Sequence, residues 1–283
     1  MPVSTSHHRP LYRQRRMYEF DTDTAVTATA PGRYVADLTD RWNIGANPNG
    51  GYLLATAGRA MSLTSTAHPD PLTVTAHYLR PGEAGPAKID VDVARTGRKL
   101  TTLRSTFSQG GKAKLEILAT FGLLANAEGP TVIARPRPDI PPPEKCVLRP
   151  PFNSDGTTVS QIAYRTETRL HPETGFVTGQ PRGDATINGW IRFVDGRQPD
   201  VLSLLLFADA FPPAVFEVLD GTGWVPTIEL TVHIRKTPAP GWLQARMSTR
   251  YLIDGYFEED GEIWDSTGTL VCQSRQLGMI FRP

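Results

Sequence analysis

The sequence has only two cysteines, Cys146 and Cys272, among 283 residues. Neither belongs to a CxxC pair, so the sequence offers no zinc framework and no dithiol redox motif. Two free thiols are favoured over one disulfide, because disulfides are rare in cytosolic proteins. The six histidines are scattered and form no HExxH motif. We therefore expect neither a metal ion nor a redox cofactor.

An excess of charge of one sign and long apolar runs are also missing. The formal net charge is +1, which gives no general attraction to nucleic acid or to an anionic membrane. No run of 18 apolar residues occurs, and no apolar signal-peptide core lies near the first residues. We expect a cytoplasmic protein without a membrane span and without a nucleic-acid partner. Hydrophobic residues make up 39% of the chain, which is enough for a sizeable core.

Proline is concentrated in one segment, between Gly122 and Ser154, which includes the triplet Pro141–Pro143. Such a segment forms neither a helix nor a central strand, so we expect an extended crossing between two parts of similar size. The predicted boundaries are 1–17 for a flexible basic arm, 18–124 for an N-terminal unit, 125–155 for a Pro-rich linker and 156–283 for a C-terminal unit.

The two units repeat one pattern. "LTVTAHYLRPG" in the first and "IELTVHIRKTP" in the second share T-x-H-x-x-[RK], and His77 and His233 lie 233 − 77 = 156 positions apart. A strand, a glycine turn and a strand follow in both, with Gly110 and Gly268 separated by 268 − 110 = 158 positions. An internal duplication is therefore predicted. We expect the two histidines in the core or at an interface rather than in catalysis.

Each unit also has one helical segment before its strands. From Asn49 to Leu63 apolar residues recur at helical spacing, with Asn49 as the N-cap. In the second unit Pro212 and Pro213 interrupt an apolar segment, which predicts a broken, buried helix. One buried helix followed by about four antiparallel strands is typical of the hotdog arrangement. We predict an α+β fold, a double hotdog in which two antiparallel sheets, each wrapped on a central helix, meet edge to edge.

One carboxylate lies inside the apolar segment of the second unit. "LSLLLFADAFPP" is apolar apart from Ser203 and Asp209. A buried, unpaired carboxylate is costly, so Asp209 needs a partner, contact with water or a chemical role. These residues alone leave two interpretations open, a bond to a helix cap or nearby amide and a catalytic base in a dry cleft.

Five segments carry a family resemblance, and in chain order they are "NGGYLLA", "HYLRPG", "FADAFPP", "PTIELTVHIRK" and "GTLVCQSRQLGMI". Together they resemble the type II acyl-CoA thioesterase family. The resemblance covers most of the chain from about Tyr34 onward, apart from the linker. It implies a hydrolase of lipid metabolism that cleaves acyl-CoA to free acid and CoA. We expect acyl-CoA as the substrate and a homodimer as the assembly.

The resemblance also implies three catalytic residues, all in the second unit. The family uses an Asp, a Thr or Ser, and a Gln to position and activate water, and these match Asp209, Thr227 and Gln276. The sequence departs from the family at Pro212 and Pro213, which follow the Asp, and at Leu277, where an acidic residue is usual. These departures concern chain-length preference and catalytic rate more than reaction type.

The chemistry of hydrolysis suits these residue types. A carboxylate whose pKa is brought toward neutrality can act as a general base, while hydroxyl and amide groups direct the water. Gly50 and Gly51 would let the substrate approach a helix N-terminus, where amides stabilise an oxyanion. The alternatives are a hydratase-type hotdog enzyme and a non-hydrolytic acyl-CoA-binding protein. The loop "NIGANPNGG" lacks the carboxylate and the histidine that a hydratase would use.

The duplication predicts one working site per chain. An offset of 156 to 158 residues maps each catalytic position onto a first-unit residue without equivalent chemistry. Asp209 maps near Leu53, Thr227 maps near Pro71 and Gln276 maps to the stretch Leu118–Thr120.

Overall fold

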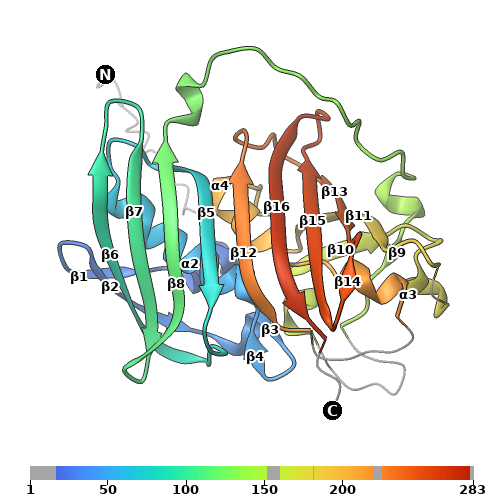
Figure 1. Ribbon diagram of the computed structural model, residues 1–283, viewed down its shortest axis with the longest axis horizontal. Coiled ribbons are helices and arrows are strands. Elements are labelled where there is room, and N and C mark those ends of the chain that lie inside the picture. Colours follow the sequence, from blue (N-terminus) through green and yellow to red (C-terminus); the bar gives the residue numbers. More distant parts are fainter. Residues whose placement is uncertain (1–16, 152–159, 181, 220–224, 281–283) are drawn as a thin grey trace, which may run out of the picture.

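A single antiparallel sheet of 14 strands forms the frame of the protein (Figure 1). The structure is a computed structural model that describes residues 17–151, 160–180, 182–219 and 225–280. The strand order is β1-β2-β6-β7-β8-β5-β12-β16-β15-β13-β11-β10-β9, and β14 pairs with β15. A separate pair, β3 and β4, precedes the first long helix.

The first unit follows the predicted order of short strands, helix and long strands. Its elements are α1 (Glu19–Asp23), β1 (Thr27–Ala30), β2 (Arg33–Leu38), η1 (Asp40–Trp42), β3 (Asn43–Ile44), β4 (Asn47–Pro48), α2 (Gly50–Thr64), β5 (Asp70–Tyr78), β6 (Gly85–Thr96), β7 (Thr101–Gln109), β8 (Lys112–Gly122) and η2 (Leu124–Asn126).

The second unit repeats this order with a shorter helix. Its elements are η3 (Pro143–Lys145), β9 (Val147–Leu148), η4 (Gln161–Tyr164), β10 (Thr166–Leu170), α3 (Gly175–Thr178), β11 (Thr186–Phe193), α4 (Val201–Phe207), η5 (Ala214–Glu217), β12 (Thr227–Ile234), β13 (Leu243–Ser248), β14 (Leu252–Ile253), β15 (Tyr256–Trp264) and β16 (Leu270–Met279).

The two units join where β5 pairs antiparallel with β12. Thr75 lies opposite Thr231, and their hydroxyl oxygens are 2.9 Å apart. The hydrogen-bonded ladder runs through this junction, so the two sheets that were predicted to meet edge to edge form one continuous sheet. Pairing satisfies the backbone groups that both edges would otherwise expose. His77 and His233 lie on these two strands and are exposed, so of the two predicted places the core is wrong, and a place at an interface stays a prediction.

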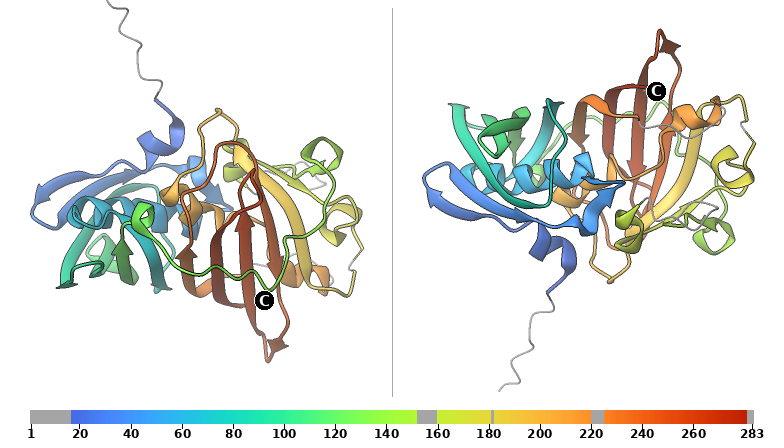
Figure 2. Two further views of the ribbon diagram at one scale, coloured as in Figure 1. Left: turned by 90° about the horizontal axis from the view of Figure 1, so that it is seen from above. Right: turned by 90° about the horizontal axis from the view of Figure 1, so that it is seen from below.

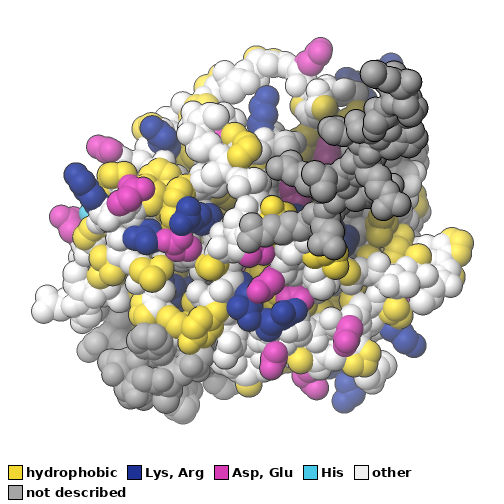
Figure 3. All heavy atoms as spheres, turned by 180° about the vertical axis from the view of Figure 1, so that it is seen from behind, with side chains coloured by type: hydrophobic (Ala, Val, Ile, Leu, Met, Phe, Trp, Pro, Cys, Tyr) yellow, Lys and Arg dark blue, Asp and Glu magenta, His cyan; other side chains and the backbone are white. Residues whose placement is uncertain are grey.

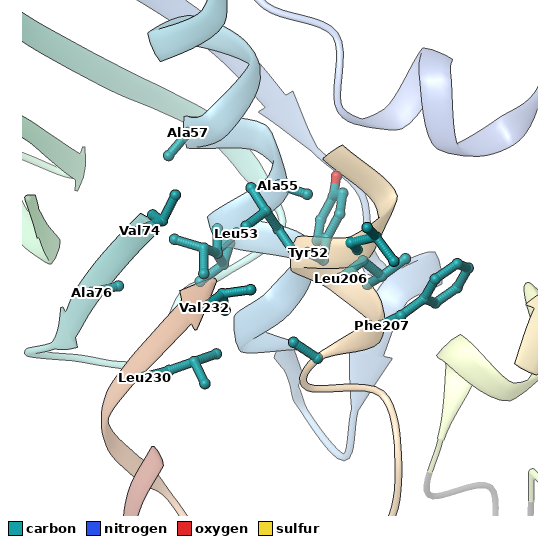
Figure 4. Packing of buried hydrophobic residues seen from close by; sticks show 14 of the residues in the cluster. Tyr52, Leu53, Ala55, Ala57, Val74, Ala76, Leu206, Phe207, Leu230 and Val232 are labelled. Atoms are coloured by element: carbon teal, nitrogen blue, oxygen red, sulfur yellow. The ribbon is translucent and has the colours of Figure 1, made fainter. Parts of the chain in front are cut away.

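Helix α2 packs against one side of the curved sheet (Figure 2). It begins after Asn49, whose side-chain oxygen accepts a hydrogen bond from the Tyr52 amide, so the predicted N-cap is confirmed. Figure 4 shows side chains of α2, α4, β5 and β12 meeting in one apolar cluster that includes Leu53, Leu206 and Val232. This cluster holds the two helices together beneath the junction of the units.

Helix α4 is short and spans only Val201–Phe207. It begins with a capping box between Asp200 and Ser203 and ends at Phe207. The chain resumes as η5 only after Pro212 and Pro213. The predicted interruption is confirmed, and it releases Asp209 from the helix into the turn that follows.

The segment after β8 passes above the ends of β12, β16 and β15 on its way to β9, and between β8 and β9 it contains only η2 and η3 (Figure 1, green). Side chains from the sheet hold its carbonyl groups: Trp190 Nε1 donates to the Pro141 oxygen at 2.8 Å, and Gln244 Nε2 donates to the Pro138 oxygen at 2.6 Å. The predicted unit boundaries stay a prediction. The arm at 1–17 lies outside the described residues apart from Met17, as does the linker beyond residue 151.

The surface carries no block of charge of one sign on the face shown in Figure 3, where acidic and basic side chains are interspersed. This distribution agrees with the formal net charge of +1. Within the described ranges, no helix has the length and apolar character needed to cross a membrane.

Candidate active site

Asp209 lies two residues beyond α4 and reaches the start of α2. Its Oδ2 accepts hydrogen bonds from the Gly51 amide at 2.8 Å and from Asn49 Nδ2 at 2.9 Å. Asn49 Nδ2 also donates to the main-chain oxygen of Asp209 at 2.8 Å. Asn49 therefore makes two kinds of hydrogen bond. Its side-chain oxygen caps α2, and its side-chain nitrogen donates to Asp209, which belongs to the second unit.

Burial controls the acidity of Asp209. Desolvation raises its pKa from 3.8 to about 6, against the opposing effect of hydrogen bonds from Gly51, Asn49 and Gly50. The side chain nevertheless keeps part of its surface exposed. A carboxylate that ionises near pH 6 and remains accessible has the properties of a general base at neutral pH.

The two glycines allow the helices to approach each other. A Cβ on Gly51 would lie 2.7 Å from the Leu206 oxygen, and one on Gly50 would lie 2.8 Å from the Tyr78 ring. The Gly51 amide binds Asp209 in this structure. Substrate binding by Gly50 and Gly51 stays a prediction, while their close packing explains why no side chain fits here.

Thr227 and Gln276 form a hydrogen-bonded pair. Thr227 begins β12, Gln276 lies on the adjacent strand β16, and Thr227 Oγ1 donates to Gln276 Oε1 at 2.9 Å. The register shift between Thr227 and Glu229 accompanies this pairing. The structure thus brings together two of the three predicted catalytic residues. Neither makes a hydrogen bond to Asp209 within the described residues.

Glu259 is a further carboxylate beside this pair, and no sequence motif indicated it. It lies on β15 directly opposite Gln276, is only 6% exposed, and accepts a hydrogen bond from Gln276 Nε2 at 2.9 Å. Burial raises its pKa to about 7, and the nearby negative charge of Asp209 adds to this effect. The strand pattern held a signal, because Phe257, Glu259 and Gly261 alternate on the buried side.

Tyr78, on β5, packs against Gly50 at the start of α2. Its hydroxyl donates to the Gly50 oxygen at 3.0 Å, and its pKa is raised by burial and by the charges of Asp209 and Glu229. The phenol therefore stays neutral and acts as a donor. No cluster able to hold a metal ion occurs among the residues that the structure describes.

Two family models match most of the chain. The model of the acyl-CoA thioesterase N-terminal domain matches residues 38–122, and that of the C-terminal domain matches residues 143–280. The chain belongs to the acyl-CoA thioesterase family. The resemblance that the sequence motifs indicated is therefore confirmed.

Similarity to solved structures and to a curated relative extends over most of the chain. A protein of Thermobifida fusca described as a candidate thioesterase II is 31% identical, with a TM-score of 0.85 over 94% of this chain and 98% of that chain. A hot dog fold protein from Alicyclobacillus acidocaldarius, 24% identical, gives a TM-score of 0.81 over 95% and 100% of the two chains. An uncharacterized protein of Mycobacterium tuberculosis is 27% identical over 277 residues, covering 87% of this chain and 90% of that protein.

These comparisons establish the hotdog fold and the thioesterase family of this acyl-CoA thioesterase homologue. They support acyl-CoA thioester hydrolysis as its general activity.

Proposed function

We propose that the protein hydrolyses acyl-CoA to a free acid and CoA, with Asp209 as the base that activates water. The observation that carries this proposal is the Asp209 carboxylate, which has a pKa of about 6 and is held by Gly51 and Asn49 through Oδ2. We assign the other oxygen, Oδ1, to the water.

In the proposed reaction the water oxygen attacks the carbonyl carbon of the thioester as a water proton passes to Asp209. The tetrahedral oxyanion then collapses, the carbon–sulfur bond breaks, and the proton held by Asp209 passes to the departing CoA sulfur. Thr227 and Gln276 direct the water, because their hydrogen bond fixes both polar groups beside it. The acid and the free thiol are the products.

The activity test is release of free thiol from a panel of acyl-CoA thioesters of different chain length. Asp209→Asn should lower kcat by a factor of ~100 or more, in the range of general-base loss. Asp90→Asn, an exposed carboxylate on β6, is the matched control and should keep wild-type turnover. Wild-type turnover in a folded Asp209→Asn protein would remove Asp209 from the mechanism. Binding without thiol release would favour the non-hydrolytic alternative, and hydration of an enoyl-CoA would favour the hydratase.

We also propose that each unit corresponds to one hotdog, with residues 18–124 around α2 and residues 156–283 around α4. The repeated order of helix and strands supports this division. The homodimer, the cytoplasmic location and the place in lipid metabolism stay predictions. Size-exclusion chromatography with light scattering tests the first of them.

A further inference from the structure

Both oxygens of the Glu259 carboxylate accept a hydrogen bond from a neighbouring amide. Oε1 accepts from Gln276 Nε2 at 2.9 Å, and Oε2 accepts from the backbone amide of Ala214 at the start of η5. The side chain is buried, so water does not replace these partners. The Ala214 amide belongs to the backbone and keeps its direction, whereas the Gln276 amide is free to turn about its last torsion.

This arrangement sets the direction of the next hydrogen bonds. An ionised carboxylate only accepts, so Gln276 presents its NH₂ group to Glu259 and its oxygen to Thr227. The Thr227 hydroxyl donates its single proton to that oxygen at 2.9 Å. The remaining lone pairs of Thr227 are therefore acceptors.

We infer that Glu259 is a positioning residue of the thioesterase site, which fixes the Gln276 amide so that Thr227 accepts a hydrogen bond from the attacking water. The inference rests on the proposed function. A water that donates one proton to Thr227 and the other to Asp209 has both protons engaged. Its free lone pair is then left to attack the thioester carbonyl.

The first test is Glu259→Gln. The new amide at position 259 offers its oxygen to Ala214 and its NH₂ group to Gln276, which must turn to present its own oxygen. Thr227 then faces the Gln276 NH₂ group and donates its proton toward the water. We expect kcat to fall by ~10–100-fold with KM within about twofold, since the interaction lost acts on the water.

The matched control is Glu258→Gln on the same strand. Glu258 accepts hydrogen bonds from the amides of Arg250 and Tyr251 at an exposed turn and makes no contact with Gln276. This variant should keep wild-type kcat and KM.

The second test exchanges the two side chains, as Glu259→Gln combined with Gln276→Glu. The amide at position 259 again takes the Ala214 proton, and its NH₂ group now faces a carboxylate at position 276. That carboxylate accepts from Thr227, so the Thr227 hydroxyl again donates toward position 276 and the total charge is unchanged. Only the bond between positions 259 and 276 is reversed. We expect kcat at least about tenfold above that of either single variant.

The outcomes separate this inference from the proposed function. A folded Glu259→Gln protein with wild-type kcat, beside an inactive Asp209→Asn protein, overturns the role of Glu259 and leaves hydrolysis by Asp209 standing. A folded double variant no faster than the single variants also overturns it. If Glu259→Gln does not fold, kcat of Glu259→Asp tests the inference instead. Its shorter carboxylate does not span Ala214 and Gln276, so unchanged kcat would contradict the inference.

Discussion

At the residue scale, the burial of Asp209 raises its pKa, and this shift makes the free energy of unfolding depend on pH. Its pKa is about 6 in the folded protein against 3.8 in an unfolded chain. The folded state therefore binds the proton more tightly. The contribution of this group to the free energy of unfolding is most favourable below about pH 4 and is lost as pH rises through 6.

Replacing Asp209 with Asn should consequently stabilise the protein at neutral pH. We predict that Asp209→Asn raises the free energy of unfolding by about 1–3 kcal/mol above pH 6, because one pKa unit corresponds to about 1.4 kcal/mol and partial exposure reduces the effect. The gain should disappear near pH 4. Urea unfolding of both proteins between pH 4 and pH 7 measures this difference in the free energy of unfolding. A difference of the same size at pH 4 and at pH 7 would contradict the raised pKa.

The same ionisation should control turnover. The base works only when ionised, so kcat/KM should rise with pH and level off once Asp209 has lost its proton. Glu259, with a pKa of about 7, interacts with Asp209, and the apparent pKa values therefore belong to the pair. We expect the rise to span pH 6 to 7. A pH–rate profile that is flat from pH 5 to 8 would argue against a carboxylate base.

Gly51 has no side chain, and this lets the start of α2 lie against α4 and Asp209. In Gly51→Ala the new Cβ would meet backbone oxygens of α4 at 2.7 and 3.0 Å, which cannot move without shifting Asp209. We predict a loss of about 1–3 kcal/mol in stability together with lower kcat. Gly58→Ala in the same helix would meet side-chain methyl groups of Leu205 at 2.6 Å and of Leu202 at 3.4 Å, not backbone oxygens, so it should cost less stability and keep kcat. Thermal unfolding and turnover of the two variants provide the comparison.

At the element scale, the sequence predicted the helices and strands well because each had a local cause. Asn49 caps α2, and Pro212 and Pro213 lie in the break between α4 and η5, both through short-range chemistry. The edge-to-edge meeting of the two units was predicted, but the choice of β5 and β12 and their register have no local cause, since they depend on partners 156 residues apart. The sequence did not indicate Glu259 for a similar reason. Its two hydrogen-bond partners, Gln276 on the neighbouring strand and Ala214 at the start of η5, are distant from it in the sequence.

The candidate site itself was only partly predictable. The motifs identified Asp209, Thr227 and Gln276, and the structure joins the last two directly. Nothing in the sequence showed that Asp209 binds the first unit through Asn49. The first interpretation of Asp209, a bond to a nearby amide, is confirmed by the Gly51 hydrogen bond, and its role as a catalytic base stays a proposal.

The strand pair and the turn after α4 should act as one catalytic unit. Asp209, Thr227 and Gln276 are proposed to bind a single water, so removing any of them disables the same step. We predict that the triple variant Asp209→Asn, Thr227→Val, Gln276→Ala is little slower than Asp209→Asn alone. Single-turnover rates of the single and triple variants test this, and losses that multiply would show that the residues act on separate steps.

At the scale of the whole molecule, the sheet register locates the counterpart of each site residue in the first unit. Thr75 and Thr231 face each other, so residues related by 156 positions occupy equivalent places on β5 and β12. Gln276 lies opposite Leu230, and the equivalent pair in the first unit is Val74 with Ala119. Glu259 lies opposite Gln276, and the equivalent residue opposite Ala119 is Leu103.

The first unit therefore lacks every group that the proposed chemistry needs. The counterparts of Gln276 and Glu259 are Ala119 and Leu103, both fully packed in the core. By the same offset Thr227 corresponds to Pro71, which has no hydroxyl, and Asp209 falls near Leu53. An apolar side chain neither takes a proton from water nor directs it, so this region serves packing. The first unit contributes instead through Asn49 and Gly51, which hold Asp209 across the junction.

One chain should accordingly carry one working site. We predict that a non-hydrolysable acyl-CoA analogue saturates at one molecule per chain in isothermal titration calorimetry. Leu103→Ala, in the silent unit, should alter stability and keep the single-turnover rate of hydrolysis, whereas Asp209→Asn should lower that rate by ~100-fold or more while binding persists. Two equivalent sites per chain, or residual turnover of Asp209→Asn that a first-unit substitution abolishes, would show that the first unit retains chemistry through residues other than those that the register aligns.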